Sequence, residues 1–233
     1  MNRMNRLMPA LVLACALLSA CQSSEPAKNN AQEKPAPEKT GVLSPLANLE
    51  SGKIPANWKV EATKSLGDLA TWQAVSDSTA PGGMALAMTA ANHDSGSTFN
   101  LCWTDSIQFK DGTLEVQVKA NSGETDQGGG LIWRARDANN YYIARFNPLE
   151  DNFRLYSIKD GTRKQLATAK ATVEKGAWFK LTIIQSGAHC ECYLDGVKML
   201  EADDTTFADA GGVGLWTKAD AATSFAGLVI TPK

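Results

Sequence analysis

Residues 128–161 read GGGLIWRARDANNYYIARFNPLEDNFRLYSIKDG, the pattern of three consecutive β-strands joined by two tight turns. Side chains alternate between the two faces of a strand, so one face of this meander is expected to be apolar. That face carries Leu131, Trp133, Ala135, Tyr142, Ala144, Phe146, Phe153 and Leu155. The opposite face carries Ile132 and Ile143 together with a polar set: Arg134, Arg136, Tyr141, Arg145, Asn147, Arg154 and Tyr156.

Short strands are predicted on both sides of the meander, separated by turn signals rich in Gly, Pro, Asp and Ser. Those before it span residues 58–61, 71–75, 84–89, 98–103 and 112–120. Those after it span 164–172, 178–185, 189–194, 197–202, 212–218 and 224–231. Roughly a dozen strands are enough for two sheets of about six, which predicts an all-β sandwich.

The first twenty residues have the features of a secretory signal: Arg3 and Arg6, an apolar run from Leu7 to Leu18, and a small-residue cleavage site. The apolar run is too short to span a bilayer. The tetrapeptide Leu-Ser-Ala-Cys ending at Cys21 resembles the bacterial lipobox, whose cysteine is linked to diacylglycerol and becomes the acylated amino terminus. This resemblance implies a membrane-anchored lipoprotein of the cell envelope, on the periplasmic face of the outer membrane if the host is Gram-negative.

The chain is expected to comprise a lipoprotein signal peptide (1–20), a disordered tether beginning at lipidated Cys21 (21–40) and a β-jelly-roll domain (41–233). Residues 22–40 contain no aromatic and no branched aliphatic side chain, so they lack the apolar surface needed to fold. Removal of the signal, with its two arginines, takes the formal net charge from −2 to −4. Without a basic excess, we expect no nucleic-acid partner.

The order of motifs resembles the concanavalin A-like jelly-roll superfamily, in particular its laminin G-like and three-keto-disaccharide-hydrolase-like branch. The motifs are GGLIWRARD, NYYIAR, RLY, a D-G turn, WFKLTI, CYLDG and GGVGLW. They cover residues 98–231, whereas 42–97 match only in strand spacing. The resemblance implies a two-sheet jelly roll whose concave sheet holds a glycan in members with known ligands; some members are hydrolases and others only bind.

The polar face of the meander is the candidate ligand-binding surface, with Arg145 in its middle strand. If residues 212–218 join the same sheet, Trp216 and Lys218 are added to it. Arginine offers a planar pair of donors to hydroxyls or carboxylates, and an aromatic ring stacks on a sugar. The predicted partner is therefore a glycan, and the number of arginines suggests an anionic one. The alternative is a structural face in which acids neutralise the arginines.

An enzyme is the second alternative, since some relatives hydrolyse glycosides. Glycosidases hold two carboxyl groups about 5 to 9 Å apart across the bond they cleave. If the protein is an enzyme, Glu115 and Glu150 are the predicted catalytic acids, although the E-x-D-x-x-E signature of family-16 glycoside hydrolases is absent. A structural envelope protein without a small ligand is the third alternative.

Three cysteines remain after the anchor: Cys102, Cys190 and Cys192. Cys190 and Cys192 are two residues apart on one strand face, which is poor disulfide geometry, so packed thiols are predicted. A bridge from Cys102 to one of them is the alternative. No motif indicates a metal or another cofactor, and the sequence leaves calcium at a sheet edge undecided.

Overall fold

The structure, a computed structural model, describes residues 41–64 and 67–233. The signal segment, Cys21 and the tether lie outside these described residues. The predicted all-β sandwich is confirmed, with fourteen strands in two antiparallel sheets of seven. Among the described residues, helical structure is limited to one short 3-10 turn, η1, Pro81–Gly83. Over the described ranges, no helix has the length and apolar character needed to cross a membrane.

The first sheet has the strand order β1-β4-β13-β6-β7-β8-β9. Its strands span Lys59–Thr63 (β1), Phe99–Phe109 (β4), Gly211–Lys218 (β13), Gly129–Asp137 (β6), Asn140–Asn147 (β7), Asn152–Lys159 (β8) and Thr162–Lys170 (β9). The predicted meander forms the adjacent strands β6, β7 and β8. Strand β13 pairs with both β6 and β4, as the candidate site requires for Trp216 and Lys218.

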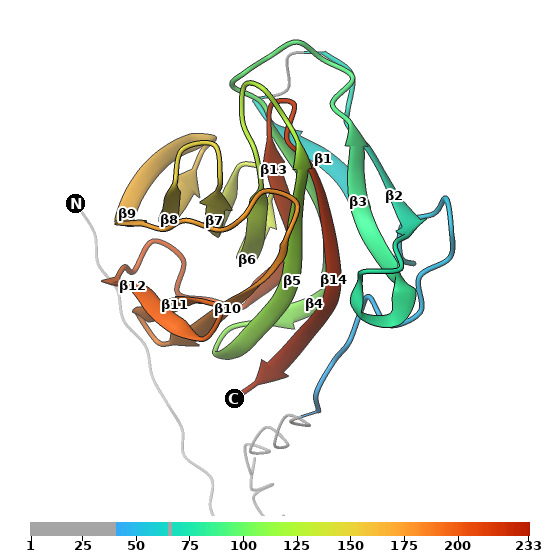
Figure 1. Ribbon diagram of the computed structural model, residues 1–233. Coiled ribbons are helices and arrows are strands. Elements are labelled where there is room, and N and C mark those ends of the chain that lie inside the picture. Colours follow the sequence, from blue (N-terminus) through green and yellow to red (C-terminus); the bar gives the residue numbers. More distant parts are fainter. Residues whose placement is uncertain (1–40, 65–66) are drawn as a thin grey trace, which may run out of the picture. The chain divides into compact units, whose positions relative to one another are not determined.

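The second sheet has the strand order β12-β11-β10-β5-β14-β3-β2. Its strands span Val197–Asp203 (β12), His189–Leu194 (β11), Trp178–Ser186 (β10), Gly112–Ser122 (β5), Ala222–Pro232 (β14), Met84–Ala90 (β3) and Thr71–Ser76 (β2). In Figure 1, β10, β5 and β14 of this sheet pass in front of β6, β13 and β4 of the first sheet.

Two Asp-Gly turns set the register of the hairpins that they close. Asp160 and Gly161 have φ of 49° and 70°, and Asp195 and Gly196 have φ of 48° and 81°. Consecutive positive φ angles are those of the two-residue turn that matches the twist of paired strands. Strand β8 is thereby joined to β9 with Ile158 opposite Arg163.

The main core lies between the sheets and is built from the alternating apolar positions. The predicted inward face of the meander is largely confirmed, because Leu131, Trp133, Tyr142 and Phe146 are all in this core with no more than 3% exposure. The ring of Phe146 meets Phe179 of β10 edge-on at 5.0 Å between centroids. Such contacts fix the first sheet against the second.

A second buried cluster covers the opposite face of the first sheet, where the sequence predicts a polar surface. Its members are Phe99, Leu101, Trp103, Ile132, Ala135, Tyr141, Ile143, Tyr156, Ile158 and Trp216, all at most 5% exposed. The hydroxyl of Tyr141 lies 2.8 Å from Oγ1 of Thr63, so β7 reaches strand β1 across this face. The prediction of a polar, solvent-exposed face is therefore wrong for the centre of this face of the first sheet. Polar side chains remain only at the margin of the face.

Candidate functional site

On the outer face of the first sheet, two arginines contact one carboxylate, and a third arginine is connected to them through Tyr156. Arg145 of β7 is the register partner of Arg154 of β8. Arg163 of β9 is the register partner of Ile158, which lies further along β8 on the same face as Arg154. Glu150 lies in the turn between β7 and β8 and contacts the first two arginines. We call Arg145, Arg154, Arg163 and Glu150 the arginine cluster.

Arg145 is buried with most of its hydrogen-bonding capacity unused. Its side chain is 2% exposed, and Nη2 donates to Oε2 of Glu150 at 3.1 Å. Its Nε and Nη1 atoms are buried and have no hydrogen-bond partner among the described residues. A buried donor without a partner costs about 1–3 kcal/mol, so such groups usually have a functional reason to persist.

Glu150 is the only carboxylate in the cluster, and one of its oxygens receives all three contacts. Oε2 accepts from Nδ2 of Asn152 at 2.8 Å and from Arg145, and it lies 3.4 Å from Nη1 of Arg154. The hydrogen bond from Asn152, with the neighbouring guanidinium groups, lowers the pKa of Glu150. Glu150 is therefore ionised at neutral pH, and its side chain is 42% exposed.

Arg163 is held by aromatic rings rather than by an acid. Its guanidinium carbon lies 4.5 Å from the ring centroid of Tyr156 and 5.5 Å from that of Phe99. These are cation–π distances, and Nη1 is buried without a hydrogen-bond partner. Nη1 of Arg154 donates to the hydroxyl of Tyr156 at 3.4 Å, so Tyr156 connects the two arginines. The cluster thus holds three positive groups against one negative group.

An open groove of about 460 Å³ adjoins the cluster along β8 and β9. It is lined by Glu150, Asp151, Asn152, Arg154, Thr168, Ala169 and Lys170. The ammonium group of Lys170 forms no ion pair with any described residue. Ordered cationic donors beside an open groove suit a ligand rich in oxygen acceptors, such as hydroxyl, carboxylate or sulfate groups.

Gly130 allows strands β6 and β7 to approach closely beside Arg145. It is the register partner of Arg145 on one side and of Trp216 on the other. A Cβ atom at Gly130 would lie 1.8 Å from the carbonyl oxygen of Ala144, so no larger residue fits.

The structure does not bring the other two predicted arginines to this place. Arg134 has a φ of 47°, and the register between β6 and β7 shifts after Trp133. Its side chain is 1% exposed and donates to the carbonyl oxygens of Lys110, Phe207 and Gly187 and to Oδ1 of Asp111. Arg136 is half-exposed and pairs with Asp209. The expectation that all four arginines share one face is therefore corrected: the distorted strand end turns two of them away.

The predicted aromatic residues are present on this face but are covered. Nε1 of Trp216 donates to the hydroxyl of Tyr141 at 3.2 Å, and both residues are fully buried. Burial raises the pKa of Tyr141. Tyr156 is 3% exposed beneath Arg163. None of the three rings presents an open face for stacking on a sugar, which corrects that part of the prediction.

Asn147 and Lys218 hold an acid at the margin of the face. Nδ2 of Asn147 and Nζ of Lys218 both donate to the carboxylate of buried Asp126, each at 2.9 Å. The side-chain oxygen of Asn147 accepts from the backbone of Leu149 and Glu150, which shapes the turn that carries Glu150. These two predicted residues therefore position the site rather than line its groove.

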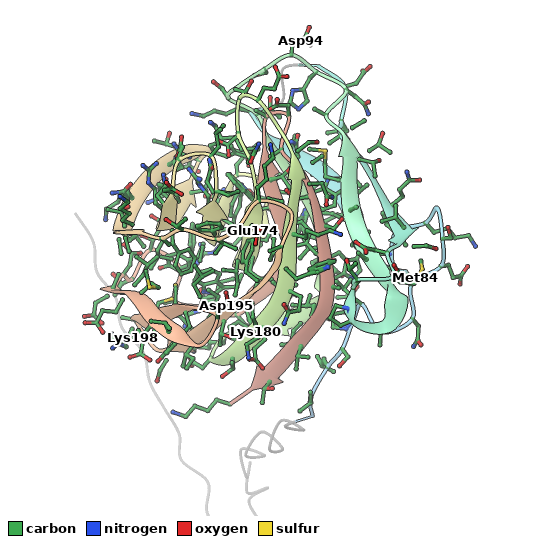
Figure 2. The ribbon with its side chains drawn as sticks, in the orientation of Figure 1. Met84, Asp94, Glu174, Lys180, Asp195 and Lys198 are labelled. Atoms are coloured by element: carbon green, nitrogen blue, oxygen red, sulfur yellow. The ribbon has the colours of Figure 1, made fainter. Side chains whose placement is uncertain are left out.

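The two predicted catalytic acids lie on opposite outer faces of the sandwich. Glu115 is on β5 between the core residues Leu114 and Val116, so it points away from the core on the second sheet. There it pairs with Nζ of Lys180 at 2.9 Å; Figure 2 labels Lys180 on β10 of that sheet. Glu150 is on the outer face of the first sheet. Glu115 and Glu150 therefore do not form a pair of acids across one glycosidic bond.

Arg163 and Lys170 were not predicted as site residues, although a signal for Arg163 was present. The Asp160-Gly161 turn makes residues 158 and 163 partners, which places Arg163 on the same face as Arg154 and Tyr156. Lys170 belongs to the site because the turn between β7 and β8 lies beside the end of β9 and forms the groove with it. The local sequence pattern does not indicate this proximity.

One further group in the described ranges has the composition of a metal site. Ligand atoms of His189, Glu191 and Glu201 on β11 and β12 lie within 4.8 Å of one another. Nζ of Lys198 donates to both glutamates, at 3.1 and 2.7 Å, and already supplies a positive charge there. Figure 2 shows Lys198 at β12, on the outer edge of the second sheet.

The three cysteines of the described domain are buried thiols. The sulfur atoms of Cys190 and Cys192 lie 3.8 Å apart. Burial raises the pKa of the Cys102 and Cys192 thiols, which keeps both protonated at neutral pH.

The two seven-stranded sheets define an all-β jelly-roll domain. Residues 48–228 match the 3-keto-alpha-glucoside-1,2-lyase-like domain family, and the chain belongs to that family.

Solved structures with the same fold include the carbohydrate-binding module CBM66 from Bacillus subtilis, which is 22% identical in sequence. That alignment covers 74% of this chain and 93% of the module, with a TM-score of 0.57. A putative glycosyl hydrolase from Parabacteroides distasonis aligns over 83% of this chain and all of its own, with 15% identity and a TM-score of 0.51. Levanase of Bacillus subtilis is 23% identical over 145 residues, which is 54% of this chain and 21% of the levanase. The chain thus spans about a fifth of that curated relative.

Proposed function

We propose that this protein binds a glycan at the arginine cluster and its adjoining groove, while a lipid on Cys21 anchors it in a bacterial envelope membrane. The observation that carries the proposal is the set of buried, unpartnered guanidinium donors on Arg145, Arg154 and Arg163 beside an open groove. Because buried donors without a partner destabilise the free protein, a ligand oxygen that reached them would bind favourably.

The likeness to a carbohydrate-binding module supports a glycan over other oxygen-rich ligands. The arrangement also suits the chemistry of sugars. The second oxygen of Glu150, Oε1, has no hydrogen-bond partner among the described residues, so it would accept a hydrogen bond from a sugar hydroxyl while Arg154 donates to a neighbouring oxygen.

The anchor is supported by the sequence of the amino-terminal segment. A signal with a lipobox-like end, followed by a polar tether, would hold the domain some tens of ångströms from the membrane, by scaling of about 5 to 6 Å times the square root of the tether length. Several acyl chains on one cysteine anchor far more firmly than one. We propose the periplasmic side of the outer membrane as its location if the host is Gram-negative.

A lyase or hydrolase acting on a 3-keto-glucoside is the second candidate, because the family is described by such an activity. Glu150 and Asp151 both line the groove and supply two carboxyl groups. The lowered pKa of Glu150 keeps it ionised but makes it a weak base, and it opposes the general-acid role, which requires a raised pKa. Binding is therefore the function that the site supports best.

The test is a glycan array probed with the intact protein and two variants. Arg154→Gln removes a groove arginine, and Arg136→Gln makes the same chemical change at an exposed site that pairs with Asp209. We expect glycan hits for the wild type and for Arg136→Gln and their loss for Arg154→Gln. Incubating each hit with the protein and analysing the products by mass spectrometry separates binding from lyase or hydrolase activity; a shortened or 3-keto-derived product would replace the first candidate by the second.

A further inference from the structure

The charges around the groove do not balance. The cluster and groove contain four cationic side chains, from Arg145, Arg154, Arg163 and Lys170, and two carboxylates, from Glu150 and Asp151. Nearby Lys218 and Asp126 form a neutral pair. A local charge of +2 therefore remains, in a chain whose formal net charge is −2.

Keeping this excess positive charge together costs free energy. Like charges repel, and the repulsion between partly buried groups is weakly screened by solvent. Arg145 is 2% exposed, and Nε of Arg145, Nε of Arg154 and Nη1 of Arg163 are all buried without a partner among the described residues. A neutral ligand would accept hydrogen bonds from these donors but would leave the positive charge uncompensated. An anionic group would accept the hydrogen bonds and also compensate the charge.

The solvent-accessible part of this excess positive charge lies at the groove. The side chain of Arg154 is 30% exposed, and Lys170 lines the groove with an ammonium group that forms no ion pair with any described residue. Arg145 lies beneath, connected to the groove through Glu150. A planar guanidinium and a mobile ammonium at one groove suit an oxyanion with several equivalent acceptors.

We propose that the ligand is an acidic glycan, and that a carboxylate or sulfate on one of its sugars pairs with Arg154 and Lys170, with Arg145 and Arg163 supplying further positive potential. This inference rests on the proposed glycan-binding function and narrows its ligand to one chemical class. Its failure is distinguishable from that of the proposed function, because a neutral glycan bound at the same groove would satisfy only the broader proposal.

The experiment is isothermal titration of the intact protein with matched pairs of polymers. Polygalacturonate is compared with its carboxyl-reduced form, and dextran sulfate with dextran. We expect at least one acidic member to bind tenfold or more tightly than its neutral counterpart, and its affinity to fall as salt rises from 50 to 200 mM. Whichever pair shows the difference identifies carboxylate or sulfate as the preferred group.

Three variants locate the binding. Arg154→Gln and Lys170→Gln should each weaken binding of the acidic polymer by about tenfold to a hundredfold, the range of one charge-assisted hydrogen bond. Arg136→Gln removes the same charge elsewhere and should leave the affinity within twofold. Thermal melts of all variants check folding, and Lys170→Gln is the variant least able to disturb it, since Lys170 has no ion pair to lose.

Equal affinity for acidic and neutral polymers would overturn this inference and leave the proposed function standing. Binding of neutral glycans alone would do the same. An equal loss in Arg136→Gln would show diffuse charge attraction and overturn the inference, as would unchanged binding in both groove variants. Absence of binding to any glycan, acidic or neutral, would overturn the inference together with the proposed function.

Discussion

Arg145→Met tests whether the cluster is maintained for a ligand rather than for stability. Methionine fills similar space without charge, so the change removes two buried unpartnered donors, each costing about 1–3 kcal/mol. It also removes one charge-assisted hydrogen bond to Glu150, worth about 1.5–3 kcal/mol. Glu150 keeps Asn152 at 2.8 Å and Arg154 at 3.4 Å and is not left alone. The net change in unfolding free energy is therefore expected between a loss of about 1 and a gain of about 4.5 kcal/mol.

Arg134→Met is the matched control, because Arg134 is an equally buried arginine in the same sheet. All its contacts are to protein groups: three backbone carbonyls and Asp111. Its loss leaves these acceptors unpaired and should cost about 3–5 kcal/mol. Urea unfolding measures both, supported by thermal melts in which 1 kcal/mol corresponds to about 2–4 °C. A loss of stability in Arg145→Met as large as that in Arg134→Met would contradict a ligand-binding role and make Arg145 a structural residue.

Three other predictions concern parts of the chain away from the cluster. Cys21→Ser should release the protein from the membrane fraction, and recovery of a normally processed variant in that fraction would contradict lipidation. Cys190 and Cys192 should both be alkylated under denaturing, non-reducing conditions, and a peptide holding both that is two hydrogens light would show a disulfide instead. The hydrogen bond to Asp203 raises the pKa of His189. This pair therefore contributes stability below the unfolded histidine pKa of about 6.5, and that stability is lost as the pH rises through the folded pKa. Asp203→Asn should lower the midpoint of the His189 NMR titration, and an unchanged midpoint would exclude Asp203 as the cause of the raised pKa.

The strands and their order were predictable because they follow from local rules. The alternation in residues 128–161 placed Trp133 and Phe146 in the core, where the structure has them. The Asp160-Gly161 dipeptide fixes a two-residue turn, from which the register of β9 and the position of Arg163 follow directly.

The detailed site was not predictable because it depends on contacts between distant segments. Arg134 leaves its expected face since its backbone adopts a positive φ and the loops around Lys110 and Phe207 provide carbonyl acceptors. The aromatic residues are buried because β7 meets β1 across the face, where Tyr141 contacts Thr63. Neither arrangement has a signature within its own strand.

The most direct test of glycan binding at the arginine cluster is an NMR titration of the arginine side chains. Nε–Hε signals of the intact protein are followed while the best-binding oligosaccharide is added. The Nε atoms of Arg145 and Arg154 have no partner in the described residues, whereas Nε of Arg134 donates to Lys110 at 2.9 Å. If the glycan binds at the arginine cluster, the signals of Arg145, Arg154 and Arg163 should shift saturably while those of Arg134 and Arg136 stay unchanged. Shifts confined to Arg134 or Arg136, or binding that leaves all three cluster signals in place, would contradict it.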